Sequence, residues 1–96
     1  MSLTGAWTIR LLDAAEADLA RLDRTVARRV TARLSWLAEH TEEVRHAPLV
    51  GALEGLYKLR QGDWRVLYEL LEGERVILVH AIGNRREIYR KEGKRR

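Results

Sequence analysis

Residues 56–90 constrain the fold most, because this part of the chain contains three strand-like runs joined by two short polar turns. Leu56–Arg60 and Trp64–Leu71 flank a three-residue connection that contains glycine, as a hairpin requires. A second turn leads into Val76–Ile82, which is nearly all apolar and therefore predicts a central strand that is covered on parts of both faces. The segment predicts three neighbouring strands of an antiparallel sheet.

The N-terminal region predicts another strand and a short helix. Trp7–Leu12 is rich in β-branched, aromatic and aliphatic residues, which is typical of a strand. Asp13 is in position to be an N-cap, with Glu16 three residues later as in a capping box. We therefore expect a helix over about Ala14–Leu22.

A second helix is predicted directly after the first. Asp23 or Thr25 caps it, and it runs to about His40. The mixed stretch Thr41–Gly55 contains proline and glycine and predicts a loop. The apolar stripe of the second helix is formed by Val26, Val30, Leu34 and Leu37.

This order of elements, β-α-α-β-β-β followed by a basic C-terminal segment, predicts an α+β fold. A helical hairpin is expected on one face of a largely antiparallel four-stranded sheet. The 96 residues are expected to form a single domain, residues 1–96. Because side chains alternate along a strand, Lys58 and Arg60 share a face with Leu56, and Arg65 shares a face with Leu67. We expect the face opposite the helices to be partly open and to carry these cations.

Composition excludes several classes of protein. Hydrophobic residues make up 46% of the chain and charged residues 33%, which is typical of a globular protein. The chain has no cysteine and only three histidines, so we expect no thiol chemistry, no metal site and no cofactor. No apolar run approaches the ~20 residues that span a bilayer, and the predicted location is the cytoplasm.

Positive charge is concentrated at the C-terminus. The net charge is +4, yet the last twelve residues carry seven Lys or Arg against two Glu, whereas the preceding 84 carry eleven cations against twelve anions. Two interpretations follow. The terminus is either a solvated tail or an edge that binds a polyanion.

A cluster of arginines near a tyrosine suits a phosphodiester substrate. The predicted strands bring Lys58, Arg60 and Arg65 near Arg85 and Tyr89. RNA carries its own nucleophile, the 2′-hydroxyl, and guanidinium groups can stabilise the charged phosphorane without a metal ion. The tyrosine is then a candidate proton acceptor; the alternative is an aromatic residue that packs the tail onto the sheet.

Two motifs resemble a known family. LYKLRQGDWRVLYEL, followed by VILVHAIGNRREIYR, resembles the RelE/ParE superfamily of type II toxins, on the RelE side. The resemblance is strongest over Leu49–Arg90. It implies a RelE-like fold and a ribosome-dependent mRNA endonuclease (an mRNA interferase) that inhibits translation.

The resemblance also implies residue roles. Arg65 matches the phosphate-stabilising arginine, and Arg85 matches the arginine proposed as acid or charge stabiliser, with Arg86 as the alternate. Tyr89 matches the tyrosine proposed as general base. The chain departs from the pattern at Leu56, where the best-known member has a second lysine, and at Asn84, where many relatives have histidine. The residues expected to bind RNA are Lys58, Arg60, Arg86 and Arg90.

Partners follow from the same resemblance. It implies a cognate RelB-like antitoxin, contact with the ribosome and mRNA, and binding to operator DNA only through the toxin–antitoxin complex. Two alternatives stay open: a ParE-like inhibitor of DNA gyrase without nuclease activity, and a catalytically weak module that mainly binds its antitoxin.

Overall fold

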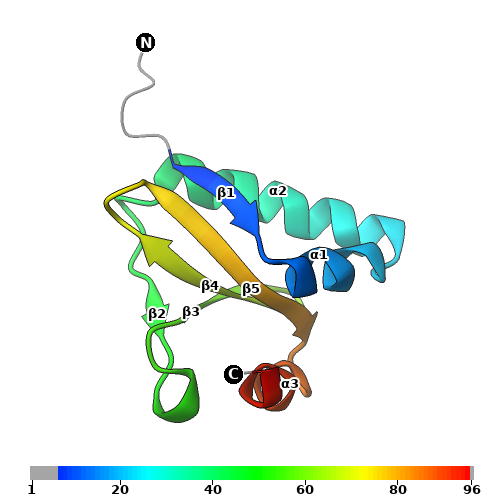
Figure 1. The fold of residues 1–96 in the computed structure, drawn as a ribbon. Coiled ribbons are helices and arrows are strands. Elements are labelled where there is room, and N and C mark those ends of the chain that lie inside the picture. Colours follow the sequence, from blue (N-terminus) through cyan, green and yellow to red (C-terminus); the bar gives the residue numbers. More distant parts are fainter. Residues whose placement is uncertain (1–6, 96) are drawn as a thin grey trace.

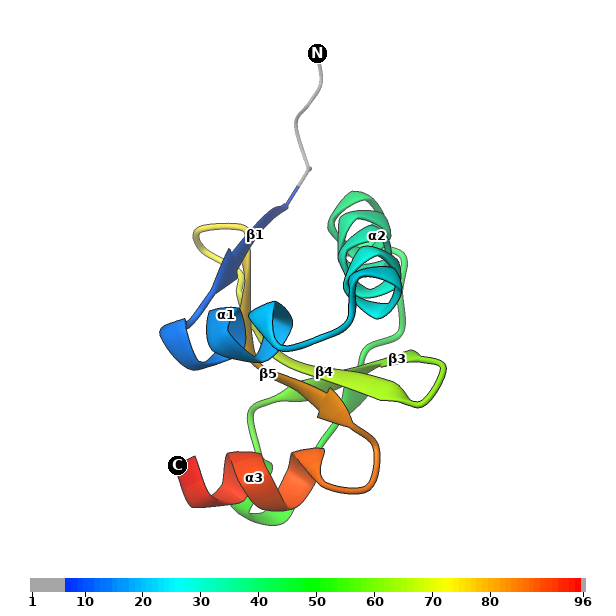
Figure 2. The ribbon, with the colours of Figure 1, turned by 90° about the vertical axis from the view of Figure 1, so that its right-hand side faces the viewer.

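A computed structural model of the chain describes residues 7–95, in which one sheet lies between two helical layers (Figure 1). Helices α1 and α2 cover one face, and α3 lies beneath the other (Figure 2). The elements along the chain are β1 (Thr8–Leu11), α1 (Asp13–Ala20), α2 (Arg24–His40), β2 (Ala47–Pro48), the 3-10 turn η1 (Gly51–Leu53), β3 (Tyr57–Gln61), β4 (Trp64–Leu71), β5 (Val76–Asn84) and α3 (Ile88–Arg95).

The sheet has five strands in the order β1-β5-β4-β3-β2, so the predicted α+β class is confirmed and the predicted number of four strands is wrong. The additional strand is β2, two residues inside the stretch that predicted a loop. It pairs with Tyr57 and Lys58 of β3. Only β1 runs parallel to its neighbour β5; the other pairs are antiparallel, as expected.

The helical hairpin forms, although its first cap differs from the prediction. Asp13 is the first residue of α1, and Leu12 occupies the N-cap position without a side-chain hydrogen bond. The predicted capping box is therefore wrong. In α2 the prediction is confirmed, since the Asp23 carboxylate accepts a hydrogen bond of 2.9 Å from the Thr25 backbone N–H.

The main core lies between the sheet and these two helices. The α2 stripe inserts Val30, Leu34 and Leu37 against the upper sheet face, as its spacing predicted. Strands β4 and β5 supply the facing side chains. We name the whole cluster the helix-side core; its buried sheet residues are Leu59, Val66, Tyr68, Ile77, Val79 and Ile82.

A second, smaller cluster lies on the opposite face, beneath β4 and β5. Ile88 at the start of α3 is fully buried against the sheet, and Leu53 of η1 packs in the same cluster. The basic C-terminal segment therefore includes a docked helix rather than a wholly solvated tail. The buried residues of this cluster, named here the α3-side core, are Leu53, Leu56, Leu67, Ala81 and Ile88.

Gly83 permits this docking. A Cβ atom at Gly83 would lie 2.9 Å from Cδ1 of Ile88, closer than unstrained packing allows. The strand predicted over Val76–Ile82 continues through Gly83 to Asn84. The glycine provides room for α3 against the sheet.

Candidate nucleic-acid interface

Register places the predicted cations on the α3 side of the sheet, in two cross-strand rows. Arg60 of β3 lies opposite Arg65 of β4, and Arg65 lies opposite Gly83 of β5. In the neighbouring row, Lys58 lies opposite Leu67. Opposed residues in antiparallel strands have Cβ atoms about 5 Å apart, and like charges in such pairs are destabilising. The Arg60–Arg65 pair is therefore an arrangement that a bound anion would stabilise.

Arg65 is held in place by its own hairpin. Its side chain is buried, with 9% of the residue exposed. Nη1 donates hydrogen bonds to the carbonyl oxygens of Gly62 (2.8 Å) and Trp64 (2.9 Å). In the part of the chain that the structure describes, no hydrogen bond engages Nε or Nη2. The guanidinium is thus fixed at one edge and keeps donors for a ligand.

Arg85 is tethered to the same hairpin from the end of β5. Its backbone N–H donates to the Asp63 carbonyl at 2.9 Å, and its Nε lies 3.6 Å from Oδ1 of Asp63. Half of the Arg85 side chain is exposed. Arg86 points an exposed side chain to solvent while its backbone N–H bonds Oδ1 of Asn84. Of the two arginines, Arg85 is the one joined to the hairpin that holds Arg65.

Tyr89 is half-buried in the first turn of α3 and packs against the α3-side core. Among the described residues, no hydrogen bond joins Tyr89 to Arg65 or Arg85. Tyr89 therefore packs the C-terminal segment onto the sheet, as in the second interpretation of this tyrosine. Arg90, the next residue, is exposed.

His80 also lies on this face, where it is partly buried and hydrogen-bonded. It is the residue that β5 carries in excess at a bulge opposite Leu67 and Tyr68. Its Nε2 lies 3.0 Å from Oε1 of Glu69, and its Nδ1 lies 3.5 Å from Oε2 of the buried Glu92. His80 thus joins the sheet to α3.

Sequence reasoning missed Asp18, a carboxylate that is 2% exposed. Strand β1 ends opposite Val79, so the edge of β5 beyond it lacks a strand neighbour. At this edge the Asp18 carboxylate of α1 replaces a strand partner, because it accepts a hydrogen bond of 3.0 Å from the Ile82 backbone N–H. The sequence position of Asp18 could have predicted its burial, because Asp18 lies three residues after Ala15 and therefore on the apolar stripe of α1.

Comparison with known proteins identifies the family. The model of the ParE toxin of type II toxin–antitoxin systems, parDE, matches residues 9–89. The chain belongs to the ParE toxin family. Membership of the RelE/ParE superfamily, predicted from the two motifs, is therefore confirmed.

Solved RelE structures share the fold of this ParE-family chain. The RelBE2 toxin–antitoxin complex from Mycobacterium tuberculosis matches with a TM-score of 0.76 and 22% identity, over 88% of this chain and 98% of that chain. A mutant of the E. coli toxin RelE in the free state matches with a TM-score of 0.73 and 23% identity, over 94% and 97%. The archaeal RelE–RelB complex from Pyrococcus horikoshii matches with a TM-score of 0.66 and 22% identity, over 83% and 96%.

A search of curated proteins by sequence finds no match. None of the helices within residues 7–95 has the length and apolar character needed to cross a membrane. Within the same residues, no group of three or more His, Cys, Asp or Glu is placed to hold a metal ion.

Proposed function

We propose that this type II toxin cleaves mRNA in the ribosomal A site. The observation that supports the proposal most directly is the Arg60–Arg65 pair, two arginines at opposed positions of β3 and β4, with Arg85 joined to the same hairpin at Asp63. A protein gains nothing in stability from placing like charges opposite one another. A phosphodiester bound between them would offset that cost, and guanidinium groups match its oxygens.

The reaction needs only groups that the chain and RNA supply. The 2′-oxygen attacks the adjacent phosphorus, the bond from phosphorus to the 5′-oxygen breaks, and a 2′,3′-cyclic phosphate remains. Arg65 and Arg85 would stabilise the charged phosphorane, while Lys58 and Arg60 hold the backbone. Tyr89 would assist removal of the 2′-proton, and the departing 5′-oxygen takes up a proton.

We expect cleavage to depend on the ribosome because of how Tyr89, the proposed base, is placed. Tyr89 lies against the α3-side core and makes no hydrogen bond to Arg65 or Arg85 in the described residues. A site of this kind depends on alignment of the 2′-hydroxyl with the scissile bond, which a ribosome-bound message can provide. Free RNA is expected to be a poor substrate.

The proposed partner is a small antitoxin. Matching structures include RelE toxins in complexes with RelB. An acidic, apolar segment of a RelB-like antitoxin would complement the exposed cations Lys58 and Arg90 beside the α3-side core. Operator DNA would then be bound by the combined complex. Co-expression with the adjacent reading frame should relieve toxicity and yield a co-purifying protein.

Cleavage of ribosome-bound mRNA, mapped by primer extension, tests the proposal. Arg65→Ala and Arg85→Ala are each expected to slow cleavage about a hundredfold, which corresponds to losing ~3 kcal/mol of phosphorane stabilisation. Tyr89→Phe should slow it as well. Arg10→Ala, which changes an arginine of β1 far along the sheet order, is the control. Parent rates in both Arg65→Ala and Tyr89→Phe, or loss of cleavage on chelation with ribosomes intact, would overturn the site.

A ParE-like gyrase inhibitor is the second candidate. It is favoured by the description of the matching family model and by the hydrogen bonds that give Arg65 a structural role. Induction of the toxin separates the two functions. Codon-positioned cuts in transcripts support the nuclease, whereas DNA damage with intact transcripts supports the gyrase inhibitor.

A further inference from the structure

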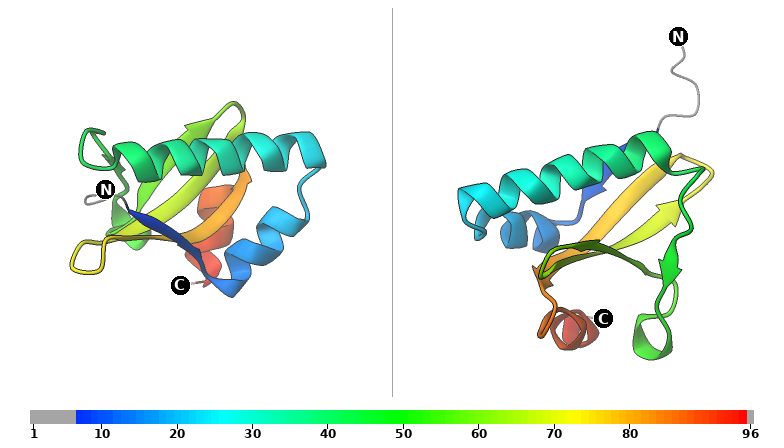
Figure 3. Two further views of the ribbon diagram at one scale, coloured as in Figure 1. Left: turned by 90° about the horizontal axis from the view of Figure 1, so that it is seen from above. Right: turned by 180° about the vertical axis from the view of Figure 1, so that it is seen from behind.

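Helix α2 carries a basic flank beside the β3–β4 hairpin, on the side of the sheet away from the Arg60–Arg65 pair. Arg29, Arg33, Trp36 and His40 recur every three or four residues and therefore follow one side of the helix. Figure 3 shows α2 crossing above the hairpin strands. No acidic residue belongs to this flank.

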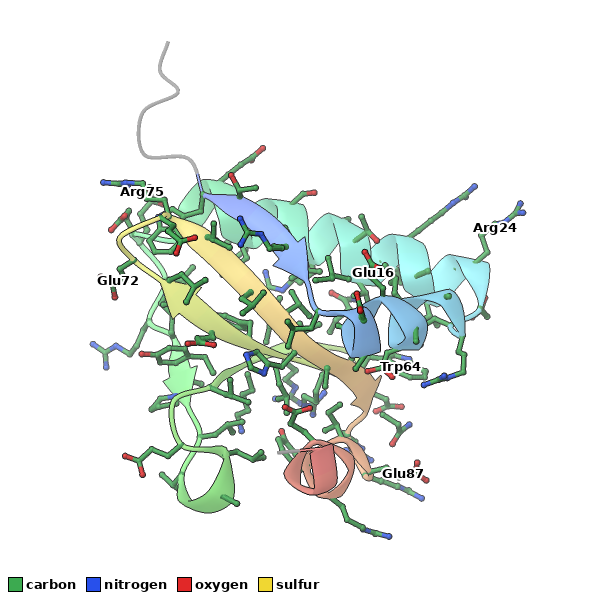
Figure 4. The ribbon with its side chains drawn as sticks, in the orientation of Figure 1. Glu16, Arg24, Trp64, Glu72, Arg75 and Glu87 are labelled. Atoms are coloured by element: carbon green, nitrogen blue, oxygen red, sulfur yellow. The ribbon has the colours of Figure 1, made fainter. Side chains whose placement is uncertain are left out.

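A groove separates the flank from the hairpin. One shallow, open hollow of about 360 Å³ is lined by Arg29, Arg33, Trp36 and Gln61. A second hollow of about 290 Å³ continues from Arg29 and Gln61 to Trp64, which lies at the hairpin end of the sheet (Figure 4). Asp63, which forms an ion pair with Arg85, is the one acidic residue among the described residues that line this second hollow. Because both hollows share Arg29 and Gln61, we treat them as one feature, the α2 groove.

Trp36 gives the groove an ordered aromatic surface. The residue is 39% exposed, one of the few large hydrophobic side chains in the described residues that face solvent. The guanidinium carbon of Arg33 lies 4.4 Å from the centre of the indole, and the His40 ring stacks on the indole at 4.6 Å with 19° between the planes. Nucleobases stack on aromatic rings and on guanidinium planes alike. Planar, cationic and exposed groups therefore favour single-stranded RNA over an acidic peptide.

The groove and the Arg60–Arg65 pair lie on opposite faces of the sheet but meet at the same edge, at Arg60 of β3. Nε of Arg33 donates a hydrogen bond of 3.4 Å to the carbonyl of Arg60, whose side chain belongs to that pair. Strand β2 pairs with Tyr57 and Lys58, so it does not cover the β3 edge at Arg60. A strand of RNA leaving the groove around this edge would reach the other face of the sheet.

We propose that the α2 groove binds single-stranded RNA, with Arg29 and Arg33 contacting phosphates and a base stacking at Trp36. The groove is a second RNA-binding surface, separate from the residues that would perform cleavage. Its affinity does not require the 2′-hydroxyl to react. Binding and cleavage can therefore fail independently.

Fluorescence anisotropy with a labelled 2′-O-methyl RNA oligonucleotide tests the groove in the full-length chain. The methyl group blocks the nucleophile, so binding is measured without cleavage. Trp36→Ala is expected to weaken binding about tenfold or more. Arg29→Ala with Arg33→Ala should reduce the slope of log affinity against log salt by about 1.4, or 0.7 for each lost phosphate contact on a single strand.

Arg24→Ala with Arg28→Ala is the matched control. Both arginines are exposed on α2 but lie off this flank, and Arg24 extends from the start of the helix away from the sheet (Figure 4). This variant should keep the parent salt slope. The thermal unfolding of each variant is compared with the parent to confirm that it is folded.

Two results would overturn the proposal. In the first, Trp36→Ala and the Arg29/Arg33 variant bind RNA as the parent does. In the second, polyglutamate of equal charge displaces the RNA and shows the same dependence on Trp36, which would assign the groove to an acidic protein segment. A third result separates the two proposals. If RNA binding depends on Trp36, Arg29 and Arg33 as expected but the protein does not cleave ribosome-bound mRNA, only the proposed nuclease function is wrong.

Discussion

The two faces of the sheet differ in how they are covered. On one face, α1 and α2 enclose the helix-side core, which contains eleven buried residues from both ends of the chain. On the other, η1 and α3 cover the α3-side core of five buried residues, and the Arg60–Arg65 pair lies beside it. The first face stabilises the domain. The second combines a modest core with two like charges at opposed positions, which is the arrangement expected where an anionic ligand binds.

The largest expected difference between the faces is in stability. Leu37→Ala removes a fully buried side chain of the helix-side core and is expected to lower the free energy of unfolding by about 3–5 kcal/mol. Leu53→Ala on the other face should cost less, because the leucine is 8% exposed and η1 can relax around it. Urea unfolding of both variants measures the difference. Equal losses would mean that both faces hold the domain together equally.

The two opposed arginines should respond differently to removal. Arg65→Ala is expected to lower the free energy of unfolding by about 1–3 kcal/mol, since the carbonyls of Gly62 and Trp64 lose a charged donor in two part-buried hydrogen bonds. Arg60→Ala, which relieves like-charge repulsion at an exposed position, should stay within about 0.5 kcal/mol of the parent. The same unfolding assay compares them. If both losses match, Arg65 does not anchor the hairpin.

The docking of α3 against the sheet should depend on the absence of a Cβ atom at Gly83. Gly83→Ala places Cβ against Cδ1 of Ile88, and the resulting overpacking is expected to cost about 1 kcal/mol and loosen α3. Hydrogen exchange should quicken in residues 88–95 and not in α1 or α2. Gly73→Ala, in the β4–β5 turn with open space around the new atom, is the control. Unchanged exchange in α3 would show that Ile88 yields without loosening the helix.

The effect that is smallest at neutral pH concerns a tyrosine of the helix-side core. Burial raises the pKa of the Tyr68 phenol, the nearby Tyr57 adds to the rise, and Arg33 opposes it. The Tyr68 hydroxyl donates to Nδ1 of His46 (2.5 Å), while Nε2 of His46 donates to the Thr41 carbonyl (2.9 Å).

Because the folded phenol keeps its proton at pH values where the unfolded phenol ionises, this stabilisation is full below about pH 10 and is lost as pH rises further. The loss is at most about 1.4 kcal/mol for each pH unit. Denaturant titrations from pH 8 to pH 11 should therefore show a steeper decline for the parent than for Tyr68→Phe. Parallel declines would mean that Tyr68 ionises equally easily in both states.

Local patterns determined much of the fold. Alternation in β4 assigned Trp64–Leu71 to a strand with the observed bounds, and the spacing of apolar residues located α2. Of the two caps predicted for α2, Asp23 and Thr25, the structure has Asp23. These features depend on neighbours within a few residues, which the sequence shows directly. The motifs in β3, β4 and the following segment also indicated the toxin family, and the match over residues 9–89 confirms it.

Other features depended on contacts between distant segments. The two residues of β2 are a strand only because β3 lies beside them, and α3 is positioned by the space at Gly83. Asp18 is buried because β1 ends before β5 does. Arg65 was predicted as a phosphate ligand, a role that stays a prediction. Its burial and its bonds to hairpin carbonyls were decided by the tertiary structure, because no local pattern specifies how far a long side chain folds back onto its own turn.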